Sequence, residues 1–491
     1  MALSNTTTTF IFFLLLLFVS ANTHLHQSNG ESSISVLISQ KGLDFVKDIL
    51  LNQVISSLTP LELPNIQKSV KIPFIGNVKV LLSNITINQI EVSSSYIKLG
   101  DSGVEILASG ATVNLSMNWY YSYSTWILVP VHISDKGTAS IQVQGMEVGL
   151  TLGLEDQEGT LKLFLKEYGC NLKSITIKLD GGASWFYQGL VDAFQGQIRS
   201  VVETSISKKT KEGILRLDSL LQTLPKEIQV DDIASLNVTI VNEPLLGDSS
   251  IGIEINGLFV AGNQVLAPNY DHIYMNGQPL AACEGSSKMI GISLDEAVFS
   301  SCSDVYFNAG VMQWVVDKVP DQSLLNTAGW KYVVPQLYRK YPNDDIKLNI
   351  SFSSSPVIKI LENKIDATVY SDMVIDVVDA NEVIPVACIS VVISASGSVE
   401  ISGNMLVGSV VLDDFTLSLK WSKIGKFHMT LIQSVMWSFL KTVATPYVNS
   451  RLRKGFPLPI VRGFTLQNAD ILYKNSLLAV CSDVVFTDSM L

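Results

Sequence analysis

The chain has 491 residues, of which 47% are hydrophobic and 16% are charged, and its formal net charge is −11. This length exceeds what a single hydrophobic core usually supports, so we expect two domains. The acidic balance disfavours broad electrostatic binding to nucleic acid or to anionic membranes. The charged fraction is below the roughly 25% of typical soluble domains, which predicts either two large cores or a cavity that holds an apolar ligand.

The first residues resemble a targeting signal. An uncharged apolar run extends from Phe10 to Ser20 and gives way to small and polar residues. Its length of about ten residues suits a signal peptide and is short of the roughly 20 that a membrane span needs. We therefore predict a signal peptide over residues 1–24, and a protein that is secreted or extracellular or is retained in the endomembrane system or cell wall.

The segment from Gly42 to Leu58 is predicted to be an amphipathic helix. Leu43, Val46, Leu50 and Val54 recur on one side of it at helical spacing.

Two unusually long strands follow, and each shifts the phase of its apolar alternation at a glycine. The shifts occur at Gly110 and at Gly145. A one-residue shift would turn the apolar face outward unless the strand bulges there, and glycine tolerates the bulge backbone. Long bulged strands coil, so the sequence predicts a curled, barrel-like antiparallel sheet.

The clearest helix of the first half covers Ser184–Ile206, and its apolar residues recur every four positions. Each step slips by about 40° around the helix axis, so the apolar face spirals and suits a twisted surface. A second helix near the C-terminus has the same four-residue spacing, which suggests two similar halves. The residues of the two stripes are Phe186, Leu190, Phe194, Ile198, Val202 and Ile206, and Leu431, Val435, Phe439 and Val443.

Residues 263–288 are rich in Gly, Pro and Asn and are predicted to link an N-terminal domain, 25–262, to a C-terminal domain, 289–491. A separate helix is expected over Lys211–Leu224.

In the second half, helices are expected over Val305–Val319 and Leu324–Tyr341. Pro446 is expected to kink the last helix.

Five cysteines in an oxidising compartment allow one or two disulfides and leave at least one unpaired thiol. Four sequons predict a glycoprotein, with the alternative that some are simply strand asparagines. They lie at Asn84, Asn114, Asn237 and Asn349.

Several stretches closely resemble the bactericidal permeability-increasing and lipopolysaccharide-binding protein family. They are Ile38–Phe45, Val305–Val315, Ser323–Asn343 and Val448–Pro459. The resemblance covers nearly the whole mature chain, and its motifs specify fold better than ligand. It implies an α+β fold, an elongated boomerang of two similar domains. Each would be a highly twisted antiparallel β-barrel with long amphipathic helices alongside, joined to the other by a central antiparallel sheet.

The resemblance also implies a phospholipid in an apolar slot of each domain. The alternative is that the same residues fill a solid core, as apolar stripes usually do. The expected slot residues are Leu43, Val46, Leu50, Phe186, Leu190, Phe194 and Ile198 in the N-terminal domain, and Val311, Trp314, Val315, Leu431, Val435 and Phe439 in the C-terminal domain.

Two features depart from the relatives that neutralise lipopolysaccharide and look similar to plant members of the family. The loop that should carry clustered lysines, Asn118–Trp126, has none, and only Lys68 and Lys71 remain nearby. The family's first-domain disulfide would involve Cys170, yet the region expected to supply its partner has no cysteine.

The same loop is rich in aromatic residues, which favour membrane interfaces. We expect a tip that contacts a membrane or lipid headgroups, the alternative being tyrosines paired across a hairpin. Scattered lysines usually only solvate a surface. The tip residues are Trp119, Tyr120, Tyr121, Tyr123, Trp126, Lys68 and Lys71.

No sequence motif of a catalytic, metal-binding or nucleotide-binding site occurs, so we expect neither an enzyme nor a cofactor. The leading hypothesis is a secreted protein that binds lipopolysaccharide or phospholipid, contacts membranes or lipid aggregates, does not bind nucleic acid, and acts in microbial sensing or defence. One alternative is a carrier of phospholipid or neutral lipid without microbial recognition. The other is a structural or interaction protein with solid barrels.

Overall fold

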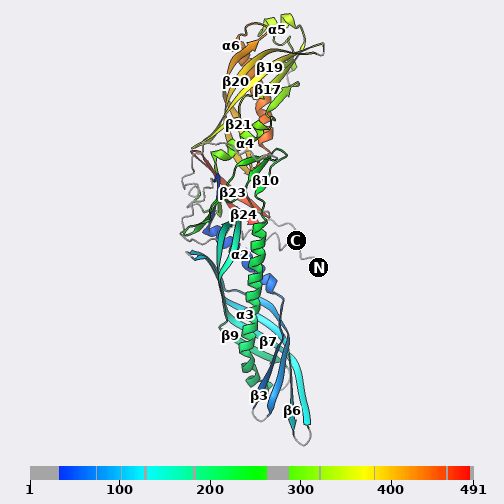
Figure 1. The fold of residues 1–491 in the computed structure, drawn as a ribbon, viewed down its shortest axis with the longest axis vertical. Helices are drawn as coiled ribbons and strands as arrows, with labels where there is room; N and C mark the ends of the chain where they lie inside the picture. Colours follow the sequence, from blue (N-terminus) through cyan, green and yellow to red (C-terminus); the bar gives the residue numbers. More distant parts are fainter. Residues whose placement is uncertain are drawn as a thin grey trace. The chain divides into compact units, whose positions relative to one another are not determined.

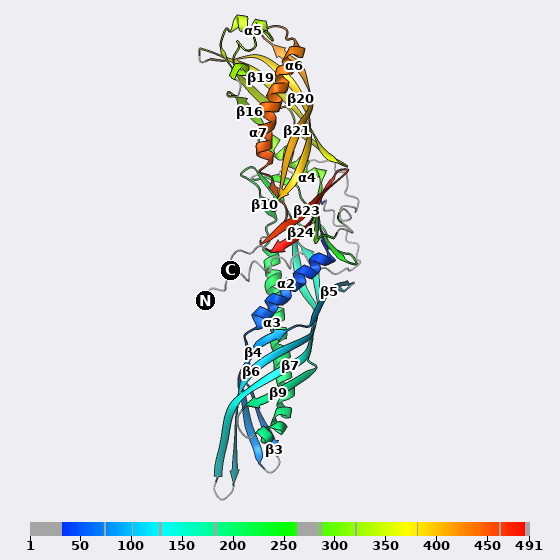
Figure 2. The same cartoon turned by 180° about the vertical axis from the view of Figure 1, so that it is seen from behind.

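The structure is a computed structural model that describes residues 32–72, 75–100, 102–126, 130–180, 184–262, 283, 287–319, 322–380, 382–460 and 463–486. Its contacts divide the chain into two compact units (Figures 1 and 2). Within the described residues, the first unit contains Ile38–Leu224 and Glu243–Gly252, and the second contains 32–37, Pro225–Asn242 and the residues from Ile253 onward. The predicted signal peptide and most of the predicted linker lie outside the described residues, and both stay predictions.

The first unit is built on an antiparallel sheet of eight strands. Its main path is β2 (Leu61–Leu63), β4 (Gly76–Glu91), β6 (Gly103–Trp126), β7 (Pro130–Gln157) and β8 (Thr160–Asn171), while β3 (Ile66–Ile72) pairs with β4, β5 (Ser94–Gly100) with β6, and β9 (Ser174–Asp180) with β7.

The two predicted glycine bulges are confirmed. Strands β6 and β7 are 24 and 28 residues long, and their pairing shifts register on both sides of Ala111. Gly110 and Gly145 have φ angles of +68° and +66°, a backbone conformation that side chains other than glycine rarely adopt. The bulges allow both strands to keep their apolar residues on the inner face through the shift.

Two helices belong to this unit, α2 (Gln40–Leu58) and α3 (Ser184–Gln222). Helix α2 was predicted, and it begins where the Ser39 hydroxyl accepts a hydrogen bond from the Gly42 N–H. The prediction of a separate helix over Lys211–Leu224 is wrong, because α3 is continuous for 39 residues. The polar stretch after Ile206 contains no proline, and its lysines and glutamate are good helix formers.

Helix α3 lies along this sheet (Figure 1). It is hydrogen-bonded to strands at both ends of the sheet. At β8, the Asp218 carboxylate accepts from the backbone N–H of Leu163 at 2.9 Å. At β3, the Lys68 ammonium donates to the Ala193 carbonyl at 3.1 Å. Among the described strands, no pairing joins the two ends of the sheet. The two ends of the sheet are therefore connected through contacts with α3 and not through backbone hydrogen bonds between strands.

The second unit contains a seven-stranded antiparallel sheet with three helical segments along it (Figure 2). The strand order is β16 (Gln313–Val316), β17 (Asp345–Phe352), β19 (Lys364–Asp379), β20 (Glu382–Ser402), β21 (Met405–Ser422) and β22 (Phe456–Pro457), with β18 (Val357–Leu361) paired to β19. The helical segments are α6 (Met429–Phe439), the π-helical turn η4 (Leu440–Ala444) and α7 (Thr445–Leu452).

Two smaller sheets account for the other strands. One has the order β12 (Leu245–Leu246), β13 (Ser250–Ile255), β1 (Ile34–Ser39), β15 (Ile290–Asp295), β24 (Leu477–Phe486) and β23 (Phe464–Lys474). The other consists of β10 (Glu227–Gln229), β11 (Ala234–Asn237) and β14 (Phe259–Ala261). The fold is α+β with several antiparallel sheets, as the sequence predicted.

Two helix predictions in the second half are wrong. Instead of a helix over Val305–Val319, α4 (Glu296–Asn308) ends before Gly310, which has a φ of +69°, and strand β16 follows. Instead of a helix over Leu324–Tyr341, the chain forms the short segments η3 (Gln322–Leu325) and α5 (Pro335–Lys340). A tight turn at Gly329 separates them. Only glycine fits in this turn, because a Cβ there would lie 1.9 Å from the Ser323 carbonyl oxygen.

Near Pro446, where a kink is expected, the structure shows a change of helix type. The π-helical turn η4 ends two residues before this proline, which is at the start of α7. A proline lacks the N–H for a helical hydrogen bond and its ring crowds the carbonyl four residues earlier. The helix therefore widens just before Pro446 rather than continuing regularly through it.

Candidate functional site

The apolar face of α3 packs against the first unit's sheet. Phe194, Ile198, Val202 and Ile206 are each at most 3% exposed and belong to one apolar cluster. The same cluster contains residues of β4, β6 and β7 such as Val80, Leu115 and Ile141, together with Ile66 of β3. The four-residue stripe thus faces the sheet along this length. Phe186 and Leu190 lie on α3, but their side chains are outside what the structure describes.

The α2 residues are divided between two surroundings. Leu43 and Val46 are buried and Leu50 is half-buried, and among the described residues none of the three joins the cluster under α3. Ile55 and Leu58, at the C-terminal end of α2, do join it. Sequence reasoning missed these two, because they lie to one side of the predicted stripe, whose last residue, Val54, is 44% exposed.

The aromatic segment Asn118–Trp126 is the end of strand β6, so the prediction of an aromatic loop is wrong. Trp119 and Tyr121 are 4% and 9% exposed, within the cluster under α3, and the Trp119 indole N–H donates to the Thr138 carbonyl at 3.0 Å. The rings of Trp119, Tyr121 and Tyr123 stack in a row with centroids 6.0 and 6.4 Å apart.

The physical reason is strand alternation, which turns every second residue inward. Tyr120, on the opposite face, is exposed, while the side chain of Trp126 lies outside the described residues. The structure therefore does not place Trp119 and Tyr121 where a membrane could contact them.

The two candidate lysines differ in their surroundings. Besides its hydrogen bond to Ala193, the Lys68 ammonium lies 5.9 Å from the centroid of the Phe194 ring, within cation–π range. Lys71 is exposed on the same strand. Lys68 thus positions α3 on the sheet, a role that the sequence alone did not indicate.

In the second unit the structure brings three predicted residues together and leaves three on the surface. Trp314 stacks on Phe439 with centroids 6.1 Å apart, and Val435 packs against the cluster that contains Phe439. Val311, Val315 and Leu431 are each about half exposed, at 49%, 54% and 47%.

Two of these exposures have local causes, while Val311 lies between α4 and β16. Val315 lies on strand β16, where its side chain alternates with that of Trp314. In α6 the buried residues are Ile432, Met436 and Phe439, which follow the ordinary helical period rather than steps of four.

Tyr447 of α7 also belongs to this aromatic group, which sequence reasoning missed. Its ring stacks on Trp314 with a centroid distance of 4.4 Å and an interplanar angle of 7°. The Arg451 guanidinium lies over the same Tyr447 ring, 5.4 Å from its centroid. The helical spacing of Tyr447 and Arg451 could have indicated their contact.

The four sequon asparagines all lie in or at strands. Asn84, with φ +51° at the bulge of β4, and Asn349 are exposed. Asn114 is half-buried and hydrogen-bonded to Gln89 and Gln142, and the side-chain amide oxygen of Asn237 accepts from the Thr239 N–H. Glycosylation at these positions stays a prediction.

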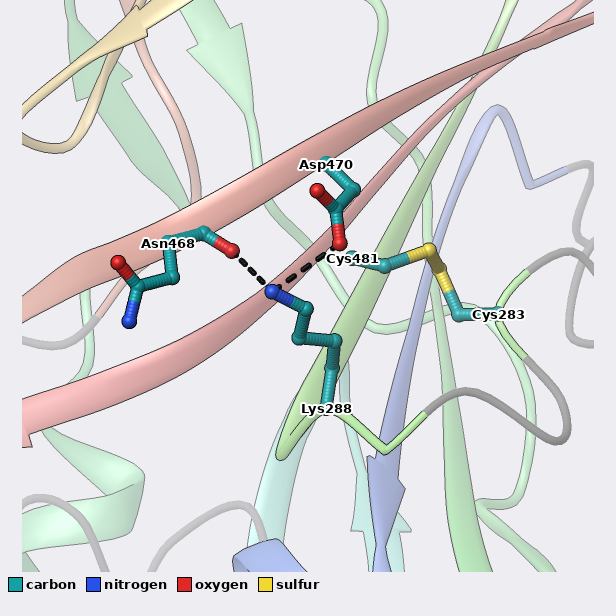
Figure 3. The surroundings of a disulfide bond; sticks show 5 residues. All are labelled: Cys283, Lys288, Asn468, Asp470 and Cys481. Carbon is teal, nitrogen blue, oxygen red and sulfur yellow. Dashed lines mark hydrogen bonds and ion pairs between the residues drawn. A yellow bond between two sulfur atoms is a disulfide. The ribbon is translucent and has the colours of Figure 1, made fainter.

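One disulfide joins Cys283 to Cys481 of β24, 198 residues apart in the chain (Figure 3). Near it, the Lys288 ammonium forms an ion pair with Asp470 at 3.0 Å and donates to the Asn468 carbonyl. Cys170, Cys302 and Cys388 are free thiols. Burial raises the pKa of Cys170 to about 11 and that of Cys302 to about 12, so neither favours the reactive thiolate.

Two family models together match almost the whole described chain. The N-terminal domain of the LBP / BPI / CETP family matches residues 42–224, and the C-terminal domain matches residues 228–486. The chain belongs to this family. Its division near residue 225 agrees with the first boundary between the two compact units.

Known members of the LBP / BPI / CETP family extend the comparison. The chain is 58% identical to a BPI/LBP family protein of Arabidopsis thaliana over 94% of this chain and 93% of that one. It is 25% identical to the bactericidal permeability-increasing protein of Sebastes schlegelii, over 92% and 95% of the two chains. The crystal structure of lipopolysaccharide binding protein superposes with a TM-score of 0.64 at 19% identity, covering 93% of this chain and 99% of that chain.

The family assignment gives this chain a lipid-binding fold. Among the described residues, no cluster of His, Cys, Asp or Glu could hold a metal ion. No helix in the described part of the chain is both long and apolar enough to cross a bilayer.

Proposed function

We propose that this protein binds an amphipathic lipid, lipopolysaccharide or a phospholipid, and that the acyl chains lie between α3 and the sheet of the first unit. The carrying observation is the contact between the spiralling apolar stripe of α3 and strands β3, β4, β6 and β7. Burial of acyl chains on such a surface contributes about 0.8 kcal/mol per CH₂ group.

The way α3 is attached supports this proposal. The helix packs on the sheet through side chains, with hydrogen bonds at Asp218 and Lys68, rather than through a continuous ladder. A helix held in this way can move away from the sheet without breaking strand pairing. Apolar side chains such as Phe194 and Ile198 would then contact the lipid instead of the sheet.

The group of Trp314, Val435 and Phe439 supports a second acyl site in the second unit. These side chains lie between β16 and α6 and are joined by the ring of Tyr447. Secretion and a role in microbial sensing or defence belong to the same proposal, which rests there on the similarity to bactericidal permeability-increasing and lipopolysaccharide-binding proteins.

A carrier of phospholipid or neutral lipid, without microbial recognition, is the second candidate. The contacts of Lys68 favour this candidate. Its ammonium group is already bonded to a carbonyl of α3 and lies over the Phe194 ring, so it is not placed to bind the phosphates of a lipopolysaccharide headgroup. Such a protein would bind phospholipid at least as tightly as lipopolysaccharide.

A filled-slot variant tests the proposal. Ile198→Trp would occupy the space of the acyl chain, and we expect it to reduce binding of a fluorescent fatty-acyl probe by the first unit. Ile292→Trp, on buried strand β15, is the matched control for overpacking, which costs about 1–3 kcal/mol. Equal probe binding by both variants and the unaltered protein would contradict the proposed slot.

A further inference from the structure

Helix α7 is an exposed helix with an apolar and basic surface. It buries none of its eight residues. Tyr447, Val448 and Leu452 are each 37% or 38% exposed, although such side chains are usually buried. Val448 and Leu452 are four residues apart, as are Tyr447 and Arg451, so these four side chains occupy adjoining positions along one side of the helix.

Helix α7 is attached to strands on two sides, because Tyr447 stacks on Trp314 of β16 and Asn449 is hydrogen-bonded to Val410 of β21. The Asn449 amide oxygen accepts from the Val410 N–H at 2.7 Å, and its amide nitrogen donates to the Val410 carbonyl at 3.0 Å. Asn449 therefore substitutes for a strand along the edge of β21. This attachment determines which side of α7 remains available to a partner.

The chain segment that contains α7 is basic, although Asp413 and Asp414 precede it on β21. Between Phe415 and Ala469 the sequence contains eight Lys or Arg residues and no Asp or Glu, although the chain carries a net charge of −11. Lys420 is paired with Asp372. Among the described residues, no carboxylate forms an ion pair with Lys441, Arg451 or Arg453.

We propose that the side of α7 formed by Val448, Arg451 and Leu452 docks on an anionic lipid surface. Exposed aromatic and aliphatic side chains next to basic residues are typical of helices that lie in the membrane interface. Trp437 and Leu431 on the preceding helix α6 are also more than a third exposed. The arginines attract the anionic headgroups, while the apolar side chains enter the headgroup region.

This inference deepens the proposed function, since a lipid-binding protein must meet the surface from which it takes its ligand. It differs from the sequence-based expectation of an aromatic tip at Asn118–Trp126, where Trp119 and Tyr121 are buried. The acidic net charge does not oppose it, because screening limits each charge to about 8 Å at physiological ionic strength.

Co-sedimentation with vesicles tests the proposal, using phosphatidylcholine vesicles with and without phosphatidylserine. We expect the unaltered protein to bind the mixed vesicles more tightly. Arg451→Glu/Arg453→Glu should weaken that binding about tenfold or more. Val448→Ser/Leu452→Ser should weaken it in the same direction.

The matched control is Lys136→Glu/Lys178→Glu, which makes the same charge change at exposed positions on β7 and β9 of the first unit. It should bind like the unaltered protein. Unchanged vesicle binding by the arginine variant, or an equal loss in the control, would overturn the docking surface. Binding of the fatty-acyl probe by the first unit should survive in every variant, so failure of the slot and failure of the docking surface give different results.

Discussion

At the scale of single residues, burial and hydrogen bonding decide which candidate side chains can reach a ligand. Trp119 and Lys68 were both expected to meet lipid headgroups, yet one is 4% exposed and the other is bonded to α3. The sequence reveals residue type and alternation, but it does not reveal that a lysine's partner is a carbonyl 125 residues away.

Replacing Lys68 tests its assignment to the helix. Lys68→Met keeps the apolar stem and removes the hydrogen bond to Ala193, so we expect a loss of about 0.5–1.5 kcal/mol in the free energy of unfolding. Lys71→Met, on the exposed side chain of the same strand, should change it by less than about 0.5 kcal/mol. Urea unfolding measures both. Weaker binding of lipopolysaccharide with unaltered stability would instead make Lys68 a headgroup ligand.

The free thiol of Cys170 should react slowly. Burial, with a smaller effect from the negative charge of Glu203, raises its pKa to about 11 from an ordinary value of 9.0. At pH 8 the thiolate fraction is then about 100-fold lower than that of an ordinary thiol. We expect alkylation by iodoacetamide, followed by mass spectrometry, to be slower by about that factor than in the unfolded chain. Equal rates in the folded and unfolded protein would contradict this environment.

At the scale of elements, the sequence predicted what depends on local pattern. The phase shifts at Gly110 and Gly145 located both bulges, and the spacing of apolar residues identified α2 and α3. Prediction from the sequence failed where tight turns override helix propensity, as at Gly310 and Gly329, and where strand β16 replaces an expected helix. Helix and strand patterns are hard to separate in short apolar runs such as this one.

The bulge at Gly145 predicts a position-specific effect of alanine. A Cβ at Gly145 would require a left-handed backbone and would lie 2.9 Å from Lys173, so Gly145→Ala should destabilise the first unit by about 1–3 kcal/mol. Gly169→Ala on β8 meets no atom within 4 Å and is the control, with an expected change below about 0.5 kcal/mol. Thermal unfolding distinguishes them, and equal midpoints would contradict the bulge.

The attachment of α7 predicts a graded series at Asn449. Asn449→Ala removes both hydrogen bonds to Val410, and we expect a loss of about 1–3 kcal/mol in stability of the second unit. Asn449→Asp keeps the acceptor and loses the donor, so its effect should be smaller. Denaturant titration followed by tryptophan fluorescence measures the order. Two variants as stable as the original would show that α7 is held by other contacts.

At the scale of the whole molecule, each unit combines a large antiparallel sheet with helices that pack on it, and the family relationship identifies this as a lipid-binding fold. Fold class was predictable because glycine phase shifts and helical stripes are encoded locally. Half of the expected slot in the second unit was not predictable. Val315 is exposed by strand alternation and Leu431 by helix phase, while Val311 lies between a helix and a strand. The ligand is encoded in neither pattern, since an apolar stripe fits many acyl chains.

The central claim is that the protein carries an amphipathic lipid. Organic extraction of the purified protein, followed by mass spectrometry, tests it most directly. We predict that lipopolysaccharide or phospholipid co-purifies in molar proportion to the protein, and that Ile198→Trp lowers the amount while Ile292→Trp does not. A protein that yields no lipid and does not bind a fluorescent fatty-acyl probe would contradict the account and would favour solid cores in both units.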